Sequence, residues 1–278
     1  MSSTDANDRS MAALTGFSVM MAGMQAAGDG YSITLPDDWL QGRTAYGGLS
    51  AAVCLEAARR AFPGLPALRS AQFAFIGPAT GVLRLAPRVL RQGKSTLFAS
   101  VDLEGDSGLA ARATLCYGAQ RESADAYDKH AMPVAPPPAD CPAFYTWPNR
   151  PNFMDHFEGR LAGGGAPMSS HALPEMLVWL RHRDAPAGDD LVRLVALADA
   201  LPPAAFASLS AGAPISTMTW AIDLFEPAPR SETGWWLVQG IAETIRHGYS
   251  AQTTVIWSPD GRPVLSARQN VAIFARKR

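Results

Sequence analysis

Cysteine is scarce in this sequence, and its few copies are widely separated. The 278 residues contain three cysteines, Cys54, Cys116 and Cys141, and none of them forms a CxxC pair. This excludes a disulfide framework and makes a CxxC-type metal or redox site untenable. The five histidines contain no HExxH motif, so the sequence predicts no metal site.

An excess of charge of one sign is also missing. The chain has 24 Lys and Arg residues against 25 Asp and Glu residues, a net charge of −1, and no block of five like charges. Nucleic-acid-binding proteins usually carry a basic patch, so this balance argues against nucleic acid as a partner. We expect the partner to be a small molecule.

Long apolar runs are absent as well. No run approaches the roughly 18–20 apolar residues that a membrane-spanning helix needs. The first ten residues, MSSTDANDRS, are polar and lack the basic and then apolar pattern of a secretory signal peptide. We therefore expect a cytoplasmic protein with no membrane partner.

The length of 278 residues suggests one large domain or two of ordinary size, and the 47% of apolar residues is enough to form a core. The Ala-rich stretch 46–62, ended by Pro63-Gly64, predicts a helix, and short extended stretches are expected before it at Gly16–Met20 and Gly30–Leu35. Period-two alternation between turn residues then predicts four strands, at Leu68–Ile76, Val82–Leu90, Ser95–Leu103 and Leu109–Tyr117. A helix followed by meandering strands is typical of an α+β fold.

Seven prolines fall between residues 122 and 152, which predicts a linker. After it the order of elements repeats, with expected strands at Phe153–Leu161 and Glu175–His182, a helix at Asp190–Ala200, and strands at Ser216–Phe225, Gly234–Ile245, Tyr249–Trp257 and Val264–Phe274. We predict an N-terminal repeat at 13–121, the linker at 122–152 and a C-terminal repeat at 153–278. Each repeat is expected to be one long helix wrapped by an antiparallel sheet.

Several short segments, in this order and spacing, resemble the acyl-CoA thioesterase II family. They are Gly42-Arg-Thr-Ala-Tyr-Gly-Gly48, Leu68–Pro78, Phe153–Glu158, Val178–Arg181, Thr217–Pro227 and Ala267-Arg-Gln269. The resemblance covers about residues 15–276. It implies a double hot-dog fold, in which a long helix is wrapped by an antiparallel sheet twice in one chain.

The resemblance also implies a catalytic site. The family holds a hydrolytic water with an Asp from the second helix, a Thr or Ser, and a Gln, which the matching segments place at Asp199, Thr217 and Gln269. The sequence departs from the family pattern in two ways that bear on this assignment. Asp199 does not follow the Ser often seen in the family, and the spacing from Asp199 to Thr217 is short. Thr219 has the same expected strand parity as Thr217, so both threonines stay candidates.

Two of these residues also stand out without the family. Between positions 265 and 273 the odd residues are apolar except Gln269, and Asp199 follows Val195 by four and Val192 by seven, beside the apolar stripe of its helix. Buried polar groups need partners, so the pair predicts a built site. The alternatives are structural: a hydrogen bond from Gln269 to backbone, and a helix-end role for Asp199.

The chemistry of thioester hydrolysis explains such a set. A partly desolvated Asp can take the proton of a water that Thr and Gln orient, and the helix start at Gly47 and Gly48 offers amides that bind the oxyanion of the substrate. For these two glycines, close packing is the alternative interpretation. The sequence has no GxSxG motif, which argues against an α/β-hydrolase. The expected function is hydrolysis of an acyl-CoA to free acid and CoA, with no metal and no organic cofactor.

Two other functions are alternatives. The first is a non-catalytic acyl-thioester-binding protein of the same fold, in which the polar residues only stabilise. The second is an enoyl hydratase, whose Asp-x4-His spacing occurs literally at Asp125 and His130, although in a polar segment rather than at a helix start. In either case we expect a homo-oligomer, a dimer or larger, as a property of the fold.

Overall fold

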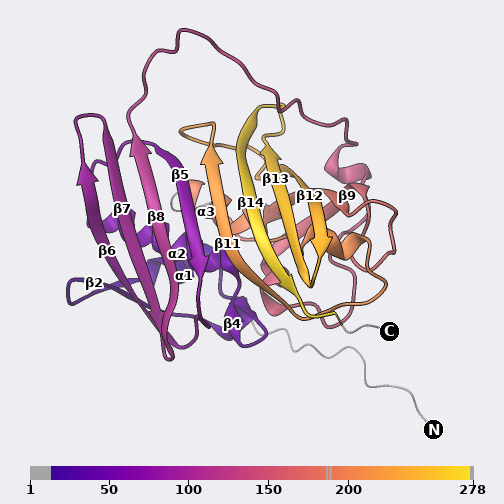
Figure 1. Cartoon of the computed structure of the whole chain (residues 1–278), viewed down its shortest axis with the longest axis horizontal. Coiled ribbons are helices and arrows are strands. Elements are labelled where there is room, and N and C mark those ends of the chain that lie inside the picture. The colour runs from indigo at the N-terminus through magenta and orange to yellow at the C-terminus, as the bar shows by residue number, and fades with distance from the viewer. Residues whose placement is uncertain (1–13, 186, 188–189, 276–278) are drawn as a thin grey trace.

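Twelve strands form one antiparallel sheet that runs through both halves of the chain (Figure 1). The computed structural model describes residues 14–185, 187 and 190–275. The first half contributes β1 (Gln25–Ala27), β2 (Gly30–Thr34), β5 (Leu68–Phe75), β6 (Val82–Gln92), β7 (Thr96–Gly105) and β8 (Gly108–Gly118). The second half contributes β9 (Phe157–Gly164), β10 (Glu175–His182), β11 (Ile215–Leu224), β12 (Trp236–Arg246), β13 (Tyr249–Trp257) and β14 (Pro263–Ile273).

The order of the strands repeats between the halves. In the first half it is β1-β2-β6-β7-β8-β5, and in the second it is β9-β10-β12-β13-β14-β11. The two halves meet where β5 pairs with β11, with Trp220 opposite Phe73. The repeated element order predicted from the sequence is therefore present. The two halves of the sheet are continuous at this pair, and the limits 13–121, 122–152 and 153–278 stay a prediction.

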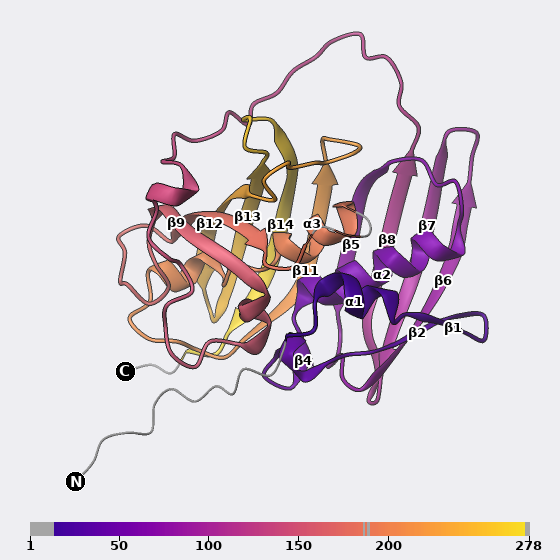
Figure 2. The same cartoon turned by 180° about the vertical axis from the view of Figure 1, so that it is seen from behind.

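The helices lie on one face of the sheet (Figure 2). They are α1 (Phe17–Ala22), α2 (Gly47–Ala61) and α3 (Asp190–Ala198). A small hairpin, β3 (Leu40–Gln41) with β4 (Thr44–Ala45), precedes α2. In the described part of the chain, no helix has both the length and the apolar character of a membrane span.

The helix α2 is the centre of the core. Residues 48–58 are buried on every side because α2 packs against both α3 and the sheet strands β2, β6, β7 and β8. Its small alanines let these neighbours approach closely. Gly64, with φ of +76°, turns the chain after the helix, as expected from its position after Pro63. The predicted helix at 46–62 is confirmed.

The second helix is shorter than expected. The sequence predicts a helix to Ala200, whereas α3 has nine residues and ends at Ala198. Asp199 stands in the turn that follows, and Ala200 packs in the core before Pro202. The expectation of a long helix in each repeat therefore holds for the first repeat alone.

Two other expectations are wrong at the level of single elements. Gly16–Met20, expected to be extended, overlaps α1, because Phe17, Met20 and Met21 have the i, i+3, i+4 spacing that buries one helical face. The strand expected at Phe153–Leu161 begins at Phe157, after a 3₁₀ helix at Asn152–His156 that Pro151 starts.

The Pro-rich segment first crosses the outside of the second half. It leaves the end of β8 as an arch (Figure 1) and then packs on the outer face of β10, β12 and β13. The indole N–H of Trp179 donates to the Pro136 carbonyl at 2.8 Å, and that of Trp257 donates to the His130 carbonyl at 2.8 Å. Proline-rich backbone has free carbonyls, so tryptophan donors can hold it in place.

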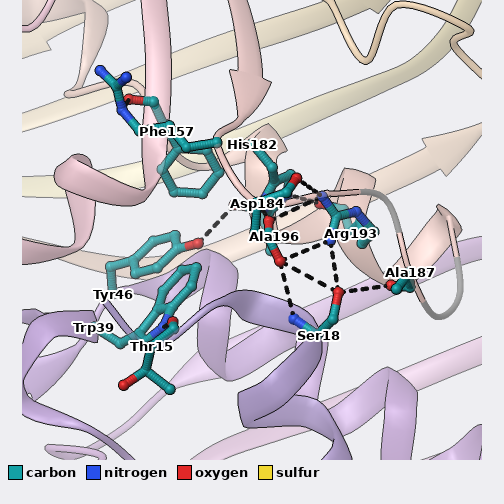
Figure 3. A network of polar contacts seen from close by, with 11 residues as sticks. Thr15, Ser18, Trp39, Tyr46, Phe157, His182, Asp184, Ala187, Arg193 and Ala196 are labelled. Carbon is teal, nitrogen blue, oxygen red and sulfur yellow. Dashed lines mark hydrogen bonds and ion pairs between the residues drawn. The ribbon is translucent and has the colours of Figure 1, made fainter. Parts of the chain in front are cut away.

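Polar contacts also join the two halves at the helices (Figure 3). The guanidinium of Arg193 on α3 donates to both carboxylate oxygens of Asp184, at 3.1 and 3.2 Å, and the backbone N–H of Ser18 on α1 donates to the same carboxylate at 3.2 Å. Near the other end of α3, the Tyr46 hydroxyl donates to the carbonyl of Ala196 at 3.0 Å (Figure 3). These bonds fix where α2 begins relative to where α3 ends.

Candidate active site

Asp199 and Gln269 meet directly, although 70 residues separate them in the chain. The Nε2 group of Gln269, on β14, donates to Oδ1 of Asp199 at 2.5 Å. The other carboxylate oxygen, Oδ2, accepts from the backbone N–H of Gly48 at 2.8 Å. The carboxylate therefore joins three elements: the end of α3, the strand β14 and the first turn of α2.

Thr217 shares a cavity with this pair. The cavity has a volume of about 300 Å³ and includes Asp199, Thr217 and Gln269 in its wall. The rest of the wall is largely apolar, with Trp147, Pro148, Pro151, Phe153, Met154, Pro167, Met168, Leu201, Pro202, Pro203, Phe206, Ala213 and Ile215 among its residues. A mostly apolar cavity with a few converging polar groups is the usual form of a small-molecule site.

A β-bulge separates the two candidate threonines. Thr217 pairs with Val271 and Thr219 with Asn270, so Met218 is the extra residue between them. Side-chain alternation restarts after a bulge, and Thr219 falls on the exposed face while Trp220, opposite Gln269, faces the core. The expectation of equal parity is therefore wrong, and Thr217 is the threonine on the cavity wall.

The glycines at the start of α2 are required by close packing. A Cβ atom on Gly48 would lie 2.6 Å from the carbonyl oxygen of Ala196 and 2.9 Å from Cβ of Asp199, and one on Gly47 would lie 2.7 Å from Oδ2 of Asp199. The N–H of Gly48 is engaged by Asp199, so it is not placed to bind substrate. Gly47 lines a second cavity of about 360 Å³, whose wall shares Thr217 with the first.

Burial raises the pKa of Asp199 to about 6, and the hydrogen bonds from Gln269 and from the Gly48 N–H act in the opposite direction. A carboxyl group with a pKa near neutrality can exchange a proton during a reaction. The phenol of Tyr46 senses this charge: its pKa is raised well above its usual value by burial and then by Asp199.

Gln252 is a further polar member of the site that sequence reasoning missed. It lies on β13 opposite Gln269, and its Nε2 donates to Oε1 of Gln269 at 2.5 Å. Its own Oε1 accepts from the backbone N–H of Ala204 at 2.9 Å. The sequence did contain a signal for Gln252. It occupies the buried face of β13 between Ser250 and Thr254, so counting every second residue of the strand would have placed it on that face.

The repeat in the fold does not produce a second copy of the site. Strand β5 has a bulge after Leu68 against β8, in the same place as the bulge after Thr217 in β11. Counting from the two bulges, Thr217 corresponds to Leu68 and Gln269 corresponds to Leu115. Leucine cannot form hydrogen bonds with its side chain, so this polar arrangement exists in one half.

The other sequence signals lie elsewhere. Asp125 is exposed in the Pro-rich segment, and the ring of His130 stacks on Phe225 with centroids 5.2 Å apart. Neither residue is on the wall of the Asp199 cavity, which removes the support for a hydratase arrangement. In the part of the chain that the structure describes, no three His, Cys, Asp or Glu side chains cluster as metal ligands would.

Comparison with known proteins gives a consistent result. The family model for the acyl-CoA thioesterase N-terminal domain matches residues 35–118, and the one for the C-terminal domain matches residues 133–273. A search of curated proteins finds no significant match.

Solved structures support the same fold. A conserved protein of unknown function with a hot-dog fold, from Alicyclobacillus acidocaldarius, is 25% identical with a TM-score of 0.83, over 93% of this chain and 98% of that one. An acyl-CoA thioesterase II from Mycobacterium marinum is 17% identical with a TM-score of 0.71, over 93% and 98% of the two chains. The α+β hot-dog fold predicted from the sequence is confirmed.

Proposed function

Because the chain belongs to the acyl-CoA thioesterase family, we propose that it hydrolyses an acyl-CoA to a free acid and CoA, with Asp199, Thr217 and Gln269 as the catalytic residues. One observation carries the proposal. A buried carboxylate of raised pKa, bonded to Gln269, stands with Thr217 on the wall of an apolar cavity. Such a group can act as a general base where substrate binds.

The proposed reaction needs one water and no cofactor. The water oxygen attacks the thioester carbonyl carbon while Asp199 takes the water's proton, and Thr217 and Gln269 orient the water. The C–S bond then breaks, and the CoA sulfur leaves with the proton that Asp199 holds. Gly47 is the first residue of α2, so its N–H has no intrahelical partner and is the proposed donor to the oxyanion.

The two cavities that meet at Thr217 fit the two ends of such a substrate. The apolar cavity suits the acyl group, and the cavity beside Gly47 suits the thiol-bearing arm of CoA. At about 300 Å³ the acyl cavity has about twice the volume of an engineered cavity that binds benzene. Trp147 and Pro151 in its wall belong to the Pro-rich segment, so we propose that this segment contributes to acyl selection.

A thiol-release assay with short, long, branched and aromatic acyl-CoAs tests the function. We expect turnover, with a preference for acyl groups that the apolar cavity can enclose. If the parent protein binds acyl-CoA and releases no CoA from any of them, the non-catalytic binder is the better description. A protein that neither binds nor hydrolyses acyl-CoA would rule out both.

The activity should depend on pH through Asp199. The base is the ionised carboxylate, and its pKa is raised to about 6, so kcat/KM should rise as pH increases through about 6 and then level off. Below about pH 6 the rate should fall about tenfold for each pH unit, because the ionised fraction of Asp199 falls tenfold for each unit below its pKa. Rates measured with one acyl-CoA between about pH 4.5 and 8.5 check this. If kcat/KM instead rose around the ordinary pKa of an exposed carboxyl group, the assignment of Asp199 as the base would be contradicted.

The bulge in β11 allows a matched pair of threonine variants. Thr217→Val keeps the shape of the side chain and removes the hydroxyl from the cavity wall, so kcat/KM should fall about tenfold, as expected for one lost hydrogen bond. Thr219→Val makes the same chemical change on the exposed face and should stay within about twofold of the parent. Equal effects in the two variants would refute the role of Thr217.

A further inference from the structure

We propose that Gln252 is a positioning residue, which holds the side-chain amide of Gln269 in the one orientation that directs its NH₂ group at Asp199. The inference rests on the proposed function, because it gives Gln252 a part in the same site. Gln252 lies behind Gln269 and outside the set of described residues that form the cavity wall. It therefore acts on the reaction through Gln269.

The orientation begins at a backbone group, which removes the usual ambiguity of a side-chain amide. The N–H of Ala204 can only donate, so Oε1 of Gln252 must face it and the NH₂ group of Gln252 must face Gln269. That NH₂ donates to Oε1 of Gln269. The NH₂ group of Gln269 is thereby left to donate to Asp199.

The chain of bonds also ends at a backbone group. The second oxygen of Asp199 accepts from the N–H of Gly48, which cannot reverse. A reversed Gln269 would bring its carbonyl oxygen against the Asp199 carboxylate and its NH₂ group against that of Gln252. Each contact would then join two acceptors or two donors, so one orientation satisfies the whole chain.

Burial makes the reversed orientation of the Gln269 amide costly. Gln252 is 5% exposed, Gln269 is 6% exposed, and Gln252 lies off the cavity wall, so water cannot replace the bond between the two amides that a reversed Gln269 would lose. The bond from Gln269 lowers the pKa of Asp199 against the effect of burial. Among the described residues of the cavity wall Asp199 is the sole acid or base, and the other titratable group that senses its charge is Tyr46.

The test removes the link and measures the proton affinity of Asp199. Gln252→Met deletes both polar ends of the side chain at nearly the same length, so Gln269 becomes free to reverse. We expect the pKa of Asp199, followed by ¹³C NMR of its carboxyl carbon, to rise by about one unit. The acid limb of kcat/KM should move upward by the same amount, and kcat at neutral pH should fall about tenfold.

Ser250→Ala is the matched control. Ser250 lies two residues before Gln252 on the same buried face of β13, and its hydroxyl has no hydrogen-bond partner among the described residues. Its removal changes a buried polar group without touching the chain of bonds. The pKa of Asp199 and the pH profile should therefore match those of the parent.

A double-mutant cycle separates positioning from general damage. If Gln252 acts through Gln269, then adding Gln252→Met to Gln269→Met should produce no further shift in the pKa of Asp199. Additive shifts, or an unshifted pKa in folded Gln252→Met, would overturn the proposal. If Gln252→Met folds poorly, Gln252→Leu provides the same comparison.

The NMR readout is independent of turnover. If the parent protein releases no CoA while Gln252→Met still shifts the pKa of Asp199, the proposed function fails and the positioning role stands. If the parent is active and the variant leaves the pKa and the pH profile unchanged, the positioning role fails and the proposed function stands.

Discussion

Replacing Asp199 by asparagine is expected to lower kcat by about 10²–10⁴-fold, the usual contribution of a general base. Asparagine keeps the size of the side chain and cannot take the proton of the attacking water. Affinity for acyl-CoA should change little, so the loss should fall on kcat rather than on binding. Steady-state rates together with a direct binding measurement check this result.

The same substitution should also lower stability. Both oxygens of Asp199 accept from groups that cannot reverse, the Gly48 N–H and the Gln269 amide held by Gln252. The NH₂ group of an asparagine would face one of these donors, and a buried mismatch of this kind costs about 1–3 kcal/mol. The thermal midpoint should therefore fall.

Turnover per folded molecule distinguishes the two roles of Asp199. A purely structural carboxylate would lower the thermal midpoint and leave turnover per folded molecule unchanged. That outcome would end the catalytic assignment. A loss of both, with acyl-CoA binding retained, is the result expected from the contacts around Asp199.

Gly48→Ala is the second substitution with a large expected effect. Alanine in place of glycine within a helix usually stabilises by about 1 kcal/mol, but here the new Cβ would lie 2.6 Å from the backbone oxygen of Ala196. The two helices would have to separate, and the bond from Gly48 to Asp199 would lengthen. We expect about 3 kcal/mol of lost stability, as for other overpacked sites, and a loss of kcat of about tenfold or more.

Gly240→Ala provides the control for this steric argument. Gly240 on β12 is also buried, but its added Cβ would meet Cβ of Ala204 at 3.7 Å, an ordinary contact. The free energy of unfolding, measured with denaturant, should therefore change by less than about 0.5 kcal/mol. A Gly48→Ala protein as stable and active as Gly240→Ala would show that the approach of α2 to α3 is not required.

Local pattern was sufficient for most of the elements. Alanine content with Pro63-Gly64 located α2, because helix formation and termination depend on neighbouring residues. Alternation between turn residues located β10 and β13 to the residue. Where it failed, at α1 and at the start of β9, the segments were short, and a few apolar residues fit a helix as well as a strand.

The polar residues of the site were only partly visible. Gln269 could be found as the one polar residue on an apolar face, whereas the choice between Thr217 and Thr219 depended on the bulge at Met218. No local spacing reveals a bulge, because it is defined by the partner strand.

By itself the sequence determined an α+β chain with a repeated order of elements, because periodicity and turn residues act over a few positions. Only the tertiary structure decided that Asp199 meets Gly48, 151 residues away, and that Gln252 orients Gln269. These contacts depend on how α2 packs on α3 and on the register of β13 with β14. The strand register also shows that Thr217 and Gln269 have no polar counterparts in the other half, where Leu68 and Leu115 occupy the corresponding positions.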